Sequence, residues 1–180
     1  MLKLIHFTAD RVESKANEPE VAGPAPRLLT AYHEAGHAVI AMALGRPLHK
    51  VTIAANRDRL GLCHVQKGRS RASKDWLEDE ILILLAGMAA ESQLSGTYNL
   101  GGAQQDLKMT RRLAIRRAGN EQQAERLERR LLTKTEHLLS DQGHWNAVQQ
   151  IAKDLLERET ISGRAALHWF NQAVAEAENA

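Results

Sequence analysis

Apolar residues recur at helical spacing along most of the chain, and this pattern predicts a mainly helical protein. The stretches 28–44, 73–94, 103–118 and 120–178 carry apolar side chains at intervals of three and four residues, as amphipathic helices do. Short β-branched and apolar runs within 50–66 predict a small β-hairpin or sheet after the first helix. The expected fold class is therefore mainly α (α+β), with the last helices forming a C-terminal helical bundle.

The organisation expected is one domain, residues 28–180, behind an irregular lead-in, residues 1–27. A chain of 180 residues is long enough to bury a core of its own. The lead-in is polar in its middle and then carries Pro24 and Pro26, which disfavour helix up to that point.

Turn and cap residues predict where individual helices end. Gly45 suits the position just after the first helix, and Ser73 can cap the start of the second. The two long amphipathic helices at 120–140 and 143–159 are expected to pack against each other as an antiparallel pair.

Composition narrows the function classes. The 24 basic and 22 acidic residues give a net charge of +2, too close to neutral to favour nucleic acid or an anionic membrane as partner. A single cysteine, Cys63, excludes an intramolecular disulfide and suits a reducing compartment. The apolar runs fall short of the roughly 18 residues that span a bilayer, so we expect a cytoplasmic protein without a membrane span.

The segment His33-Glu34-Ala35-Gly36-His37 carries the clearest chemistry. Side chains four residues apart lie on one face of a helix, so His33 and His37 can present two imidazoles to one metal ion. Glu34 lies beside them, where its carboxylate can take a proton from water activated by that ion. Because so short a pattern also arises by chance, the motif alone is a hypothesis.

A catalytic zinc site needs a third protein ligand and an open fourth position. Two carboxylates stand out, Glu91 and Asp106, since each follows a stretch of small or glycine residues that permits close backbone approach. Spacing along the sequence does not choose between them.

Five segments in order resemble one family. They are 30–39 around His-Glu-Ala-Gly-His, the strand residues within 51–61, 85–91 with Gly-x-Ala-Ala-Glu, 102–107 with Gly-Ala-x-x-Asp-Leu, and 155–163 with Leu-Leu-Glu-x-Glu-Thr. Together they are similar to peptidase family M41, the protease domain of the FtsH-type ATP-dependent zinc metalloproteases. The resemblance spans about residues 28–170.

The resemblance implies a zincin-like fold and a set of roles. It makes Asp106 the third zinc ligand, beside His33 and His37, and leaves Glu91 as a candidate to orient a ligand histidine from behind. It also implies a strand that pairs with an extended substrate through backbone hydrogen bonds. The residues of this substrate-binding strand are Leu60, Gly61, Leu62 and Cys63.

The function expected is a zinc-dependent metallopeptidase that hydrolyses peptide bonds in unfolded or flexible polypeptides, with Glu34 as the catalytic base. Nothing in the sequence matches Gly-x-x-x-x-Gly-Lys-Ser/Thr, so we expect activity that is independent of ATP, with a separate ATPase or adaptor as a candidate partner. The segment 111–122 is shorter than its counterpart in FtsH, which predicts a more open or differently shaped cleft. The resemblance also implies self-association, as a hexamer.

Two other functions compete with this one. A non-catalytic binding or assembly module could keep the zinc-containing fold, although Glu34 would then have no purpose. Nucleic-acid binding is disfavoured because glutamates follow the basic run closely and no aromatic residues interleave with it. That basic run consists of Arg111, Arg112, Arg116 and Arg117.

Overall fold

The computed structural model describes residues 25–54, 62–65 and 75–180, and within them the protein is mainly helical with one small antiparallel sheet. This confirms the expected fold class. The elements, in order, are α1 (Pro26–Ala43), β1 (Leu48–Thr52), β2 (Leu62–Val65), α2 (Trp76–Ser95), α3 (Gln104–Ala118), α4 (Glu121–Ser140), α5 (Gln142–Arg158), β3 (Thr160–Ser162) and α6 (Gly163–Glu178).

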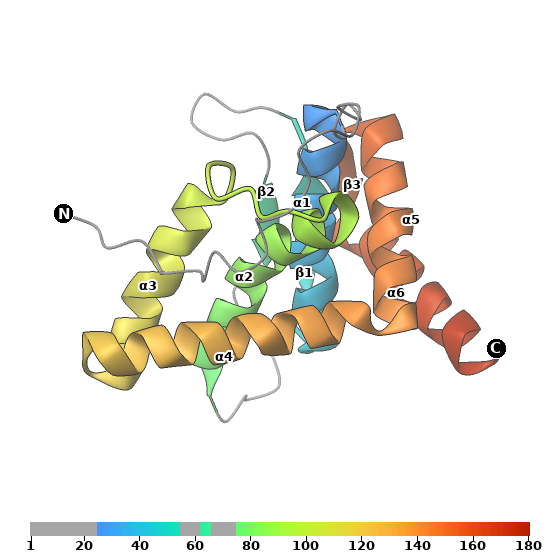
Figure 1. The fold of residues 1–180 in the computed structure, drawn as a ribbon. Coiled ribbons are helices and arrows are strands. Elements are labelled where there is room, and N and C mark those ends of the chain that lie inside the picture. The colour runs from blue at the N-terminus through green and yellow to red at the C-terminus, as the bar shows by residue number, and fades with distance from the viewer. Residues whose placement is uncertain (1–24, 55–61, 66–74) are drawn as a thin grey trace, which may run out of the picture.

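Helix α1 lies at the centre of the molecule, between α2 and α5 (Figure 1). Nearly every residue from Ala31 to Met42 is buried, because helices cover it on both sides and the sheet lies against it as well. Gly36 brings α1 close to α2, since a Cβ at this position would lie 2.6 Å from the Ala86 carbonyl oxygen. Polar side chains in this buried part of α1 need partners within the protein, and the buried polar residues there are His33, Glu34 and His37.

Two helix starts differ from those expected. Helix α1 begins at Pro26, two residues before the expected start at residue 28. Proline is tolerated in the first turn of a helix, because backbone N–H groups there have no hydrogen-bond partner within the helix. Helix α2 is capped by Asp75, whose carboxylate accepts a hydrogen bond from the backbone N–H of Glu78 at 3.3 Å. Ser73, the expected cap, lies outside the described residues.

The sheet has the strand order β2-β1-β3, with both neighbours antiparallel to β1. Val51 of β1 pairs with Cys63 on one side and with Ile161 on the other. The Oγ1 atoms of Thr52 and Thr160 lie 2.6 Å apart and join β1 to β3 a second time. Strand β3 was not expected, because a strand of three residues is too short to show an alternating pattern.

The expected antiparallel pair of α4 and α5 is wrong. Asp141 alone connects the two helices, ending α4 and capping α5 through a hydrogen bond from the His144 N–H at 3.0 Å. One residue cannot reverse the chain, since antiparallel helices need roughly two to eight residues between them. Helix α4 therefore runs across the molecule against α2 and α3, whereas α5 packs against α1 and α6 (Figure 1).

The start of α6 is pressed against β1 at Gly163, and this contact yields a test of the fold. A Cβ there would lie 1.9 Å from the Leu48 carbonyl oxygen, a backbone atom that cannot turn aside. We expect Gly163→Ala to lower the free energy of unfolding in urea by about 3 kcal/mol. The matched control is Gly101→Ala, whose Cβ would meet its nearest neighbour, Asn99, at an ordinary 3.6 Å. Equal stabilities of the two variants would contradict this contact.

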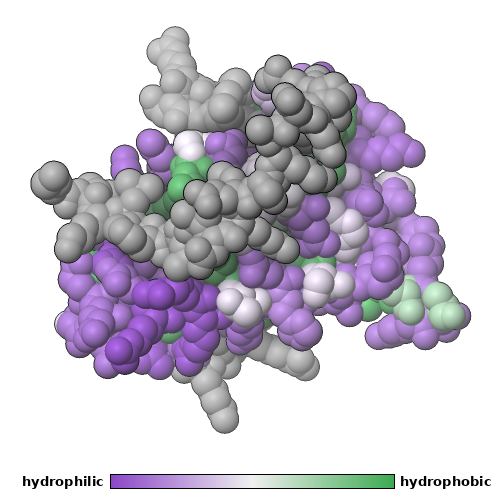
Figure 2. Space-filling model, viewed as in Figure 1, coloured by the Kyte–Doolittle hydropathy of each residue, from purple (hydrophilic) through white to green (hydrophobic). Residues whose placement is uncertain are grey.

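The described surface is mostly hydrophilic on the face in Figure 2, with hydrophobic residues in small patches. The large apolar side chains most exposed among the described residues are Trp76, Met109 and Leu167, which lie on different helices. None of the described helices combines the length and apolar character needed to cross a bilayer.

Candidate metal centre

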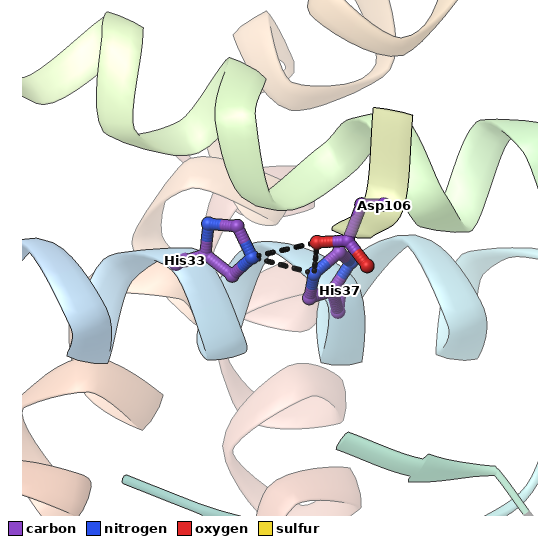
Figure 3. Close-up of side chains that lie close together, drawn as sticks. All are labelled: His33, His37 and Asp106. Atoms are coloured by element: carbon purple, nitrogen blue, oxygen red, sulfur yellow. Dashed lines mark hydrogen bonds and ion pairs between the residues drawn. The ribbon is translucent and has the colours of Figure 1, made fainter. Parts of the chain in front are cut away.

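Helices α1 and α3 bring His33, His37 and Asp106 together at one point (Figure 3). The Nε2 atoms of the two histidines lie 2.9 Å apart. Asp106 Oδ2 lies 3.0 Å from His33 Nε2 and 3.4 Å from His37 Nε2. The histidines are buried, and the Asp106 side chain is 25% exposed, so the cluster opens to solvent on the side of α3.

The other nitrogen of each imidazole is already engaged with an acceptor. His33 Nδ1 lies 2.5 Å from Glu91 Oε1, and His37 Nδ1 lies 2.6 Å from the Ile83 carbonyl oxygen, both on α2. Because a carboxylate and a carbonyl only accept, each Nδ1 carries a proton and donates it. With the proton on Nδ1, the nitrogen left to bind a metal ion is Nε2, and the Nε2 atoms of both rings face Asp106.

Two imidazole nitrogens and one carboxylate oxygen, all electron-pair donors, therefore meet at one point, where a proton or a metal cation can lie between them. Zinc binds imidazole nitrogen and carboxylate oxygen at about 2.0–2.2 Å, which places tetrahedral ligands about 3.3 Å apart. The three separations here, 2.9, 3.0 and 3.4 Å, are close to that value. Two imidazoles and one carboxylate are also a donor set of catalytic zinc sites, so these side chains fit a zinc ion.

The electrostatics of the cluster also favour positive charge at its centre. Burial acts to lower the pKa of His33, but hydrogen bonds to Asp106 and Glu91 outweigh it and raise that pKa to about 10. For Asp106 burial acts to raise the pKa, and hydrogen bonds with the two histidines outweigh it and hold the pKa well below its usual range. Without a metal the cluster thus retains a proton on His33, in place of the cation.

Gly87 of α2 lies directly against the two imidazoles. A Cβ at this position would lie 2.6 Å from both His33 Nε2 and His37 Nε2, the nitrogens that face Asp106. Any side chain here would occupy the space of the metal-facing atoms. Gly87 belongs to the Gly-x-Ala-Ala-Glu segment, a pattern that does not itself indicate this close contact with the two imidazoles.

The remaining predicted site residues are placed in different ways. Glu34 is 6% exposed on α1, and its charge acts on His33. Leu62 and Cys63 lie in β2, an edge strand of the described sheet, whereas Leu60 and Gly61 lie outside the described residues. The structure thus brings Glu91 and Asp106 to the two histidines and leaves the substrate role of β2 a prediction.

Sequence reasoning missed Asn99, which lies in the loop between α2 and α3. Its side-chain Nδ2 donates a hydrogen bond to Glu91 Oε2 at 3.2 Å, and its Oδ1 accepts one from the Gly102 N–H at 3.0 Å. A polar residue in a glycine-rich loop is usually a turn former, so the sequence offers only a weak signal for this role.

Arg111 of the basic run is held within the fold. Its guanidinium forms ion pairs that connect α3, the helix of Asp106, to α4. The partners are Glu121, Glu125 and Glu128, at 2.8, 3.5 and 3.1 Å respectively.

A helix-borne histidine pair with a carboxylate from a second helix is the arrangement of metal-dependent hydrolases. Comparison with known proteins agrees with that class. The sequence model of Peptidase family M41 matches residues 20–120, more than half of the chain, and the chain belongs to this family.

Curated relatives carry related names. Over 90 residues the chain is 36% identical to ATP-dependent zinc metalloprotease FtsH 2 of Salinibacter ruber, a match that covers 48% of this chain and 13% of that protein. Over 189 residues it is 29% identical to ATP-dependent zinc metalloprotease FtsH of Magnetococcus marinus, covering 82% of this chain and 28% of that one. The chain thus spans less than a third of the length of these relatives.

Proposed function

We propose that this chain is a zinc-dependent metallopeptidase domain that hydrolyses peptide bonds in unfolded or flexible polypeptides. The observation that carries the proposal is the meeting of His33 Nε2, His37 Nε2 and Asp106 Oδ2 within about one zinc coordination sphere, with both Nδ1 atoms already bound to acceptors. Membership of peptidase family M41 supports the same reading.

In this proposal each residue has a defined task. His33, His37 and Asp106 hold the zinc ion, which when bound supplies a Lewis acid for the scissile carbonyl and for water. Glu34 accepts the proton of the attacking water and passes it to the leaving nitrogen. Glu91 and the Ile83 carbonyl keep the two imidazoles turned toward the centre. Strand β2, at the edge of the sheet within the described residues, offers its backbone to that of an extended substrate.

Metal removal tests the proposal directly. The purified chain is expected to contain about one zinc ion per molecule and to cleave casein, which has little stable structure. Dialysis against 1,10-phenanthroline should abolish cleavage, and added zinc should restore it. Zinc content is measured by atomic absorption, and cleavage by the release of labelled peptides. Cleavage that persists without metal would contradict the proposal; zinc binding without any cleavage would favour the non-catalytic module.

We further propose that this cleavage requires no ATP, because the 180 residues contain no phosphate-binding loop motif. A stably folded protein should then resist the purified chain unless a partner unfolds it, so a separate ATPase or adaptor is the partner proposed. Assembly into a homo-oligomer and a cytoplasmic location stay predictions from the sequence.

A further inference from the structure

The Asn99 side chain forms hydrogen bonds with Glu91, which lies behind His33, and with Gly102, which lies in the loop before the helix of Asp106. Through Nδ2 it donates to Glu91 Oε2, and the other oxygen of that carboxylate accepts from His33 Nδ1 at 2.5 Å. Through Oδ1 it accepts from the N–H of Gly102, two residues before α3 begins. One side chain thus connects the carboxylate behind His33 with the loop that leads into the helix of Asp106.

We propose that Asn99 is a positioning residue that sets the spacing between His33 and Asp106 for zinc; this inference rests on the proposed function. Glu91 is 4% exposed, so its second oxygen has little access to water and needs a donor from the protein. The Asn99 amide is that donor, and it fixes the rotation of the carboxylate. A fixed carboxylate in turn fixes the ring of His33.

The loop is built closely around this amide. Gly102 has no room for a side chain, since a Cβ there would lie 2.7 Å from Asn99 Nδ2. The backbone of Asn99 is held as well, because its carbonyl accepts from the Ala103 N–H at 3.3 Å. Its neighbour Tyr98 donates a hydrogen bond to Glu136 of α4. The amide is therefore held from the loop side independently of its contact with Glu91.

The hydrogen bond between Glu91 and Asn99 can be tested by exchanging the carboxylate and the amide between the two positions. Asn99→Asp keeps the acceptor for Gly102 but replaces the donor with a carboxylate oxygen that faces the negative charge of Glu91. Glu91→Gln keeps an acceptor for His33 and gains a donor on its other side. The double variant Glu91→Gln/Asn99→Asp restores one carboxylate and one amide, with the hydrogen bond between them reversed.

The experiment measures zinc affinity by competition with a chromophoric chelator, and the visible spectrum of the cobalt-substituted chain. Each single variant is expected to weaken zinc binding about 10–100-fold and to alter the cobalt bands. The double variant should bind zinc at least about tenfold more tightly than either single variant. If the two residues acted independently, the losses of the single variants would add instead. Asn146→Asp on α5 is the matched control, since it makes the same charge change at a residue away from the cluster and keeps the oxygen that accepts from Gln142.

Several results would overturn the inference. One is an Asn99→Asp variant with wild-type zinc affinity and cobalt spectrum; another is a double variant whose loss equals the sum of the single losses. If Asn99→Asp fails to fold, as judged by thermal unfolding of the metal-free chain, the comparison of Glu91→Gln with the double variant decides. A wild-type chain that binds no zinc overturns the proposed function together with this inference. A wild-type chain that binds zinc while Asn99→Asp has no effect overturns only the role of Asn99.

Discussion

Replacing Glu34 with glutamine is expected to lower kcat/KM for an unfolded substrate about 10³-fold while zinc content stays at the wild-type level. Glutamine has nearly the same shape as glutamate, so it fills the buried position on α1 with little repacking. It cannot accept a proton at neutral pH, so the transfer from water to the leaving nitrogen loses its carrier. The measurement combines steady-state cleavage of a fluorogenic peptide with metal analysis of the same preparation.

The matched control for this variant is Glu157→Gln, at an exposed position on α5. It makes the same chemical change away from the cluster and should leave both zinc content and cleavage as they are. Full activity in Glu34→Gln would show that another group carries the proton. Loss of zinc from Glu34→Gln would instead assign Glu34 a structural role in the centre.

Gly87→Ala should be the second large effect, with zinc affinity weakened at least about 100-fold and cleavage lost with it. The added methyl would lie 2.6 Å from the Nε2 atoms of His33 and His37, so both rings must turn away from Asp106. The stability of the metal-free fold should change much less than the zinc affinity. Alanine is more favourable than glycine in a helix interior by about 1 kcal/mol, which offsets part of the cost of turning the two rings away from their hydrogen-bond partners.

Two measurements separate these effects in Gly87→Ala. Isothermal titration with zinc reports the affinity, and urea unfolding in the presence of a chelator reports the stability of the metal-free fold. Gln93→Ala, an exposed change on the same helix, is the control for both. Zinc binding at wild-type strength in Gly87→Ala would contradict the proposed position of the ion between the two rings.

Local pattern was enough to predict the central helix and its motif. The spacing of His33 and His37 is set by the helix itself, so a few neighbouring residues contain the information. The third candidate ligand could not be chosen from local spacing in this way. Glu91 and Asp106 both reach His33, and they differ in which ring nitrogen they meet. That difference depends on how α2 and α3 lie over α1, which no spacing along the chain encodes.

Other features could not be predicted from the sequence, because they depend on backbone atoms or on residues far away along the chain. The Ile83 carbonyl that holds His37 belongs to no side-chain pattern, since every residue carries a carbonyl group. Strand β3 exists because β1, far away in the sequence, offers it an edge. The direction of α5 was mistaken because two long amphipathic segments suggest a hairpin, and only the single residue between them, Asp141, prevents it.

The sheet order β2-β1-β3 has a consequence for how the chain is made. Thr52 and Thr160, which meet across β1 and β3, lie 108 residues apart. A ribosome adding roughly 5–20 residues per second needs about 5–20 s to cover that distance. During this interval α1 has been synthesised without α5, one of the two helices that bury it. The three candidate ligands all precede residue 107, so the nascent chain holds the complete ligand set before the cover of its central helix exists.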